Sequence, residues 1–390
     1  MNQNTNNKNN GNSVRLVKEP SEGERLDVGS LFLLLYRSYR DARRNKRNTR
    51  SQLRFESDLE HNLLELAVLL ESREYAPLPS ACFINELPVK REVIAADFRD
   101  RVVHHLLCSW LFPVFERLFI YDSYSCRKGK GTLFGINRVR GFVRRASDDF
   151  RRDCWVLRLD IKGFFYFYKV TKKHEKFLYT IITGGKRQWK MKKIMTSTQK
   201  PILYDLIIDG LDRCGWYGVA DTDLCRFLVH LIVFADPLES ALVRSPPYAW
   251  DGLPKDKSLK YSGDGKGLGN LTSQLFANIY LNQLDHFVKR ELKIECYGRY
   301  VDDMVLVHSD KSVLLRAIEC IRRFLSDRLL LELHPNKIRL QPVSYGFSFL
   351  GQYILPYRVY PCRRLRRALN TTMDVVAYYG QLAHLNGTTC

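Results

Sequence analysis

The sequence predicts an α+β protein with more than one lobe, in which amphipathic helices alternate with short strands. Apolar residues recur three and four positions apart in Phe55–Ser72, which is the period of a helix with one buried face. Cys154–Tyr168 and Tyr297–Asp310 are instead short apolar runs of strand character that carry carboxylates at their ends or turns. A chain of 390 residues that is 45% hydrophobic is long enough for two or three such lobes.

Charge is the strongest compositional signal. The formal net charge is +20, and a protein this basic has a natural partner in a polyanion such as a nucleic acid. No run of about 18 apolar residues is present to span a membrane, so no membrane partner is expected. The N-terminus is polar and lacks the apolar core of a signal peptide, which predicts a cytoplasmic protein. The 10 cysteines show no zinc-ligand spacing and are expected to be free thiols.

The N-terminal region is expected to contain a disordered leader at residues 1–25 and a basic helical arm at residues 26–80. Tyr36–Arg50 carries seven basic residues against one acid. Such a run is either a solvated helix face or an RNA-facing arm. The candidate nucleic-acid contacts are Arg43, Arg44, Lys46 and Arg47.

Two later segments also combine positive charge with loop-forming residues. In Tyr121–Arg145, Arg127 and Lys130 stand beside glycines just before a predicted helix, which indicates either a generic turn or a phosphate cradle. Thr183–Lys200 has six Lys or Arg residues and no acid, and is interpreted as an exposed insertion that contacts nucleic acid through Lys186, Arg187 and Lys190. A Pro- and Gly-rich loop is expected at 244–267, followed by a helix that opens near Thr272.

Three carboxylates lie at the ends of strand-like segments. Asp160 follows an apolar strand, while Asp302 and Asp303 lie between two runs that form a predicted hairpin. Each alone fits a strand cap or a solvated turn. Together they suit two Mg²⁺ ions, because hard cations prefer carboxylate oxygens and offset the repulsion between neighbouring acids. One acid from a first strand and two from a later hairpin is the arrangement of palm-type polymerases.

Seven short segments follow one another along the chain: "PVKREVIAADFRDRVVHHLLC", "DSYSCRKGKGT", "LRLDIKGFF", "GNLTSQLFANIYL", "YVDD", "LELHPNKIRL" and "FSFLGQYI". This ordered series resembles the motifs of the reverse transcriptase family. That resemblance implies a right-hand polymerase fold, with fingers and palm at residues 81–350 and a primer-grip end with a small helical thumb at 351–390.

The resemblance also implies roles for individual residues. Asp160 and Asp302 would bind both Mg²⁺ ions (Mn²⁺ as a substitute), with Asp303 and the backbone of Ile161 beside them. Phe165 would be the steric gate that favours dNTPs, and Gln274 would lie under the nascent base pair. The triphosphate contacts would be Arg127 and Lys130, and Lys337 would face the leaving pyrophosphate. The implied partners are a template RNA, a primer or cDNA, and dNTPs.

Within the family, "LGNLTSQ" at 268–274 resembles reverse transcriptases of diversity-generating retroelements. Such an enzyme would make errors opposite adenines and work with a small accessory protein. Lys266-Gly267 before this motif and "YFYKVTKK" after the palm strand depart from that group. Those departures suit anti-phage defence reverse transcriptases, which use a structured non-coding RNA. A retron-type enzyme and a catalytically silent RNA-binding protein on the same fold stay open.

Overall fold

The computed structural model describes residues 25–44, 48–86, 90–164, 200–235, 241–253 and 270–362. The predicted contacts Lys46, Arg47, Phe165, Lys186, Arg187 and Lys190 lie outside these residues, as do the predicted leader up to residue 24 and the predicted thumb after 362. None of the helices in the described ranges combines the length and the hydropathy that a membrane crossing requires.

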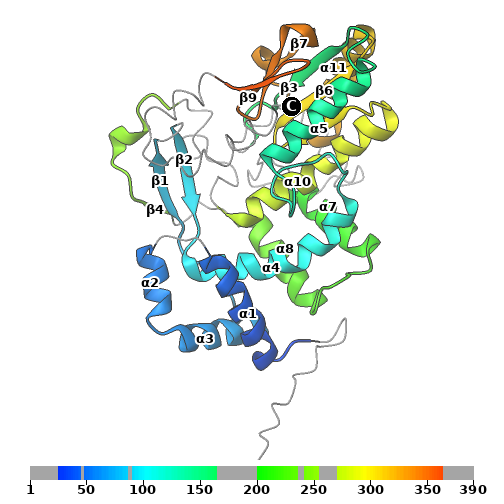
Figure 1. Ribbon diagram of the computed structural model, residues 1–390. Helices are drawn as coiled ribbons and strands as arrows, with labels where there is room; N and C mark the ends of the chain where they lie inside the picture. Colours follow the sequence, from blue (N-terminus) through cyan, green and yellow to red (C-terminus); the bar gives the residue numbers. More distant parts are fainter. Residues whose placement is uncertain are drawn as a thin grey trace, which may run out of the picture.

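Three helices form the N-terminal part: α1 (Val28–Arg43), α2 (Arg50–Glu56) and α3 (Leu59–Glu71). The Asp27 side chain caps α1 by accepting a hydrogen bond from the Ser30 amide. Leu31 and Leu35 are buried on the inner face of this helix. The sequence predicted one helix over Phe55–Ser72, but the chain turns at residues 57–58 and the segment forms two helices. These helices lie at the bottom of the molecule in Figure 1.

A small sheet and four further helices follow. The sheet has the order β2-β1-β4, with β1 (Ala81–Asn85) and β2 (Arg91–Ala95) antiparallel and β4 (Leu242–Val243) parallel to β1. The helices are α4 (Phe98–Leu118), α5 (Thr132–Ala146), α7 (Lys200–Arg213) and α8 (Thr222–Phe234). A short 3₁₀ turn, η1 (Pro247–Trp250), lies within the segment that was predicted to be a loop.

The central sheet has four antiparallel strands in the order β5-β6-β3-β7. Their bounds are β3 (Trp155–Leu159), β5 (Tyr297–Tyr300), β6 (Asp303–His308) and β7 (Arg339–Pro342). The helix α10 (Leu271–His286) and its π-helical continuation η3 (Phe287–Glu291) lead into β5. After β6 come α11 (Lys311–Phe324), the π-helix η4 (Leu325–Leu329) and the 3₁₀ turn η5 (Pro335–Lys337).

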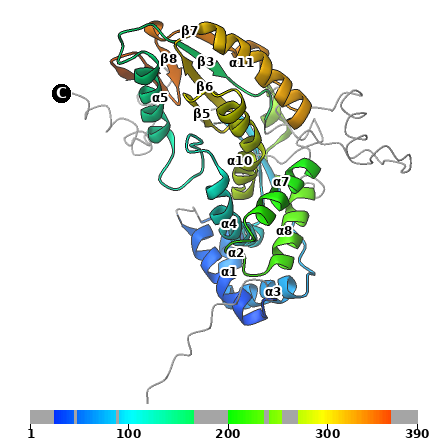
Figure 2. The same ribbon diagram turned by 90° about the vertical axis from the view of Figure 1, so that its right-hand side faces the viewer.

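Side chains alternate between the two faces of this sheet, as the strand period requires. Leu157 and Leu159 of β3 join the large core formed with α4, α10 and α11. Val156 instead joins a second core with residues of α5 and of the hairpin β8 (Phe347–Phe349) and β9 (Gln352–Ile354). Figure 2 shows α5 and α11 on opposite sides of the sheet. The 3₁₀ turn η6 (Val343–Tyr345) precedes β8, and β10 (Val359–Pro361) pairs with β9.

Candidate active site

The three acids predicted to act together come from adjacent strands of the central sheet. In the register of β3 with β6, Leu159 pairs with Met304, so the next position along places Asp160 opposite Asp303. Asp302 lies in the two-residue loop between β5 and β6, because Tyr300 pairs with Asp303. The backbone therefore brings Asp160 together with two neighbouring acids that lie about 140 positions later in the sequence.

The hairpin that carries Asp302 and Asp303 is strained. Val301, the first residue of its loop, has φ +55°, a left-handed conformation that a β-branched residue rarely adopts. Such conformations cost about 1–3 kcal/mol and persist where the surroundings hold them in place.

A buried ion pair supports the β5–β6 loop that carries Asp302. The Arg299 guanidinium lies 2.7 Å from the Asp285 carboxylate, and both side chains are fully buried. The same guanidinium donates through Nη1 to the carbonyl of Val301, at 2.9 Å. Tyr297 donates its hydroxyl hydrogen to Asp285, and Asn278 accepts from Arg299. This network links the hairpin to α10 and explains how the left-handed residue is maintained.

The acids lie in an environment that opposes their ionisation. Burial, with smaller contributions from the carboxylates of Asp303 and Asp160, raises the pKa of Asp302 to about 7. Burial and the Asp160 carboxylate also raise the pKa of Asp303, while Arg158 and Lys337 oppose that shift. A divalent cation would relieve this repulsion, and carboxylate oxygens are the donors that Mg²⁺ prefers.

Lys337 was predicted to lie near the reacting phosphates, and the structure places it at the acids. Its Nζ is 2.7 Å from Oδ2 of Asp160. Lys337 ends the 3₁₀ turn η5, and β7 begins two residues later at Arg339. Within the described ranges, no three His, Cys, Asp or Glu side chains converge closely enough to hold one ion. The donor chemistry fits Mg²⁺, and the Asp160 carboxylate would have to turn from Lys337 to bind it.

Two of the residues predicted to contact the nucleotide, Gln274 and Lys130, are at least partly exposed. Gln274 is exposed on the first turn of α10, where its Oε1 accepts a hydrogen bond from the Cys126 thiol at 3.0 Å. Lys130 is partly exposed and donates to the Tyr121 carbonyl. Both lie on the loop or helix end where the nucleotide was expected. The role of the Ile161 backbone stays a prediction; Ile161 forms an isolated antiparallel bridge with Leu333.

Arg127 is placed differently from the prediction. Its buried guanidinium lies 2.6 Å from Glu116 and also donates to the carbonyls of Ile120 and Ser123. With these N–H groups already donating, the geometry favours a role in holding the loop over the predicted contact with a triphosphate.

Another polar residue of α10 is buried. Asn278 donates to the Ser125 carbonyl and does not reach the surface beside Gln274.

The basic arm also differs from expectation. Arg43 points inward and pairs with Glu56 at 2.8 Å, while Arg44 pairs with Asp41 at the surface. Arg37 and Arg40 are the arginines that α1 exposes on its outer face. The structure therefore supports a basic face on this helix through residues other than Arg43.

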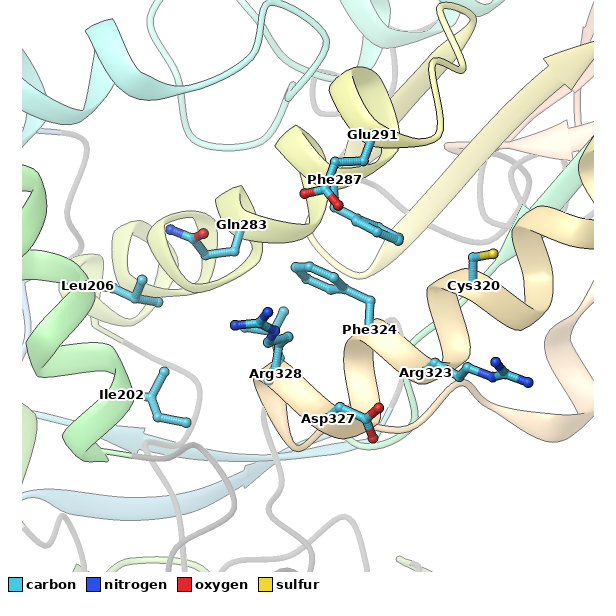
Figure 3. Close-up of a pocket in the computed structure, with 11 residues that line it drawn as sticks. Ile202, Leu206, Gln283, Phe287, Glu291, Cys320, Arg323, Phe324, Asp327 and Arg328 are labelled. Atoms are coloured by element: carbon cyan, nitrogen blue, oxygen red, sulfur yellow. The ribbon is translucent and has the colours of Figure 1, made fainter. Parts of the chain in front are cut away.

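One cavity lies away from the acids. It has a volume of about 620 Å³ and is formed by α7, α10, η3, α11 and η4. Phe287 and Phe324 stack in its wall with ring centroids 4.3 Å apart, and Glu291 and Arg328 contribute charge (Figure 3). Because α11 covers the sheet face opposite Asp160, this cavity is separate from the candidate active site.

Sequence reasoning missed Arg299, Asp285, Arg158 and Arg339. Their common signal was a charged residue within an otherwise apolar strand or helix, as in "VLRLD" and "NQLDHF". Such a residue is rarely buried without a partner, but the sequence does not say which partner it has.

No protein-family model and no curated protein matches the sequence. Solved structures with some likeness to the chain include telomerases. Apo telomerase from Candida tropicalis, truncated from its C-terminal domain, gives a TM-score of 0.47 at 11% identity over 77% of this chain and 60% of that chain. Telomerase from Candida albicans with a TWJ fragment of telomeric RNA gives 0.41 at 10% identity, over 78% of this chain and 51% of that one. The C. tropicalis telomerase with a TWJ fragment gives 0.46 at 11% identity, over 76% and 48%.

This chain thus spans about half to three-fifths of the length of those telomerase chains. TM-scores under 0.5 do not establish a common fold, so the functional assignment depends on the geometry of the chain's own residues.

Proposed function

We propose that the chain is an RNA-directed DNA polymerase that extends a primer on an RNA template, with two Mg²⁺ ions bound at Asp160, Asp302 and Asp303. The observation that carries this proposal is the register that sets Asp160 opposite Asp303, with Asp302 in the adjoining hairpin loop. The ions would supply Lewis-acid stabilisation of the attacking and leaving oxygens in phosphoryl transfer.

The chain's own residues would position the reactants. Asp160 would hold the ions from the end of β3 and Asp302 from the β5–β6 loop, while the Arg299 network keeps that loop in one conformation. Lys337, once released from Asp160, would place a cation beside the charge that develops on the pyrophosphate. Gln274 would contact the nascent base pair from the first turn of α10.

Primer extension by the purified protein tests this proposal. The wild-type chain is expected to make DNA from dNTPs on a primed RNA template with Mg²⁺ or Mn²⁺. The substitution Asp302→Asn should reduce the rate of primer extension at least about a thousandfold. Asp310→Asn is the matched control, since Asp310 is an exposed N-cap of α11 and asparagine caps helices equally well. Absence of DNA synthesis by the wild type, or equal rates for both variants, would refute the polymerase.

The Lys337–Asp160 ion pair favours one alternative, a catalytically silent RNA-binding protein whose acids are neutralised internally. The same experiment separates the two functions. A silent protein would bind the primed template and make no DNA, and its biological effect would survive Asp302→Asn.

We infer further, from the motif "LGNLTSQ", that the template is a dedicated RNA of a diversity-generating retroelement. Sequencing of the cDNA is the test: substitutions concentrated opposite template adenines are expected. Uniform fidelity, with co-purification of a structured non-coding RNA, would instead favour the defence-associated role.

A further inference from the structure

Two rows of charged residues cross the central sheet on the face that carries the acids. The strand order and registers align Asp303, Asp160 and Lys337 in the first row, as the Lys337–Asp160 contact of 2.7 Å confirms. The second row lies two residues back along β3. It contains Arg158 and, directly opposite on β7, Arg339. Residues two apart on a strand are about 7 Å apart and lie on the same face, so the arginines adjoin the acids.

The two arginines face each other without a paired acid. Like charges directly across an antiparallel pair destabilise a sheet unless something neutralises them. Neither guanidinium lies within 4.0 Å of a carboxylate oxygen of a described residue, and Arg158 donates from Nη1 to the Ser348 hydroxyl of β8 at 3.2 Å. Arg158 is partly buried and Arg339 is exposed. Burial and the charge of Arg339 lower the pKa of Arg158, while Asp303 and Asp160 raise it.

Guanidinium groups bind phosphate in a fork geometry that lysine does not reproduce. Two of them on neighbouring strands, with a hydroxyl beside them, form a subsite for a phosphate that is open to solvent on the Arg339 side. The charge of a bound phosphate would also remove the repulsion between the arginines.

The position of the two arginines relative to the acids indicates which phosphate of the nucleic acid or nucleotide they would bind. β3 ends at Leu159, and the chain leads on through Asp160 to Ile161, beside which the incoming nucleotide is expected. Arg158 is therefore on the other side of the acids, beside the β8–β9 hairpin. We propose that Arg158 and Arg339, with the Ser348 hydroxyl, bind the backbone phosphate next to the 3′ end of the strand being extended. This inference rests on the proposed polymerase function.

Charge reversal at the exposed position tests the subsite. In Arg339→Glu the new carboxylate faces Arg158 and pairs with it, so thermal stability is expected to hold or rise. Affinity for a fluorescent primed template, measured by anisotropy without dNTPs or Mg²⁺, is expected to fall roughly tenfold. The dependence of log affinity on log salt should become shallower by about one.

Arg316→Glu is the matched control, because it makes the same charge change at an exposed position of α11, on the opposite face of the sheet. The subsite is refuted if both variants bind the primed template equally well. It is also refuted if Arg339→Glu leaves template binding intact and raises KM for dNTPs, since the phosphate would then belong to the triphosphate. The binding assay needs no catalysis, so it gives its answer even if the wild type makes no DNA.

Discussion

The ion pair beneath the hairpin gives the sharpest prediction about how the site is held. Arg299→Met removes a guanidinium that lies 2.7 Å from Asp285, with both side chains fully buried. The Asp285 carboxylate keeps the Tyr297 hydroxyl, which does not neutralise its charge. Leaving one charge of a buried pair without its partner costs about 3–5 kcal/mol, so the free energy of unfolding should fall by that amount. Asp285→Leu should cost a similar amount, because it leaves the arginine unpaired.

The double variant Arg299→Met/Asp285→Leu should lose much less than the sum of the single losses. No buried charge is left, and the remaining cost comes mainly from three groups that lose hydrogen bonds of 3.2 Å or less: the Tyr297 hydroxyl, the Asn278 amide oxygen and the Val301 carbonyl. The Ser123 hydroxyl loses only a longer contact of 3.4 Å with Arg299. At about 1 kcal/mol for each group, the free energy of unfolding of the double variant should fall by about 3 kcal/mol. The coupling energy of the cycle should therefore be at least about 3 kcal/mol.

Urea denaturation of the four proteins measures this cycle. The exposed pair Arg323–Glu319 on α11 provides the control cycle, with an expected coupling of about 0.5 kcal/mol or less. If the losses at Arg299 and Asp285 simply add, the pair does not act as a buried ionic unit and the reasoning is wrong. The double variant should also extend primers more slowly than wild type, since the Val301 carbonyl has lost its donor. Unchanged kcat would show that this bond does not position the hairpin.

Three further predictions concern other parts of the molecule. Gly298→Ala would place a Cβ within 3 Å of the Tyr124 ring, so a fall in Tm is expected by calorimetry, and unchanged stability would show that the ring yields easily. Burial raises the pKa of Asp100 to about 6, so the folded state favours the protonated carboxyl. The stability that this preference contributes is fully present below about pH 4 and is lost as pH rises through 6. Asp100→Asn should flatten the pH dependence of urea unfolding in this window, by up to about 3 kcal/mol, and an unaltered slope would contradict the assignment. Burial, with the nearby Arg127 charge, lowers the pKa of Lys130 to about 8, so KM for dNTPs should rise above pH 8 in wild type and stay level in Lys130→Arg.

The sequence predicted the elements that carry the acids because their signals are local. Alternation along 297–310 and a two-residue separation between two strand-like runs are enough to predict a hairpin. The start of α10 near Thr272 follows from the same kind of local pattern, and the structure confirms it. The register that sets Asp160 opposite Asp303 depends on pairing between distant strands, which local patterns do not determine.

Side-chain partners were harder to predict than elements. Arg127 stands in a glycine-rich basic loop that suggested a free cation, but Glu116 on the preceding helix comes within 2.6 Å of it. Arg43 was assigned to RNA on charge alone, yet the turn after α1 brings Glu56 to it. In both cases the acid is about a dozen residues away in the sequence, and only the path of the chain between them decides whether they meet.

The candidate site gathers several unfavourable features in one place, and their positions indicate how they are tolerated. A left-handed valine, a half-buried acid with a raised pKa and two facing arginines all lie on or beside one face of the sheet. Each is within two residues of Asp160 or Asp302 along the chain, or directly across the sheet from such a position. The opposite face is covered by the large core of α4, α10 and α11, which supplies the apolar burial that fixes the strands. If strain and charge are tolerated here because a dication and a phosphate relieve them, Mg²⁺ together with a primed template should raise the Tm of wild type more than that of Asp302→Asn or Arg339→Glu. Equal shifts in all three proteins would show that these features are not linked to ligand binding.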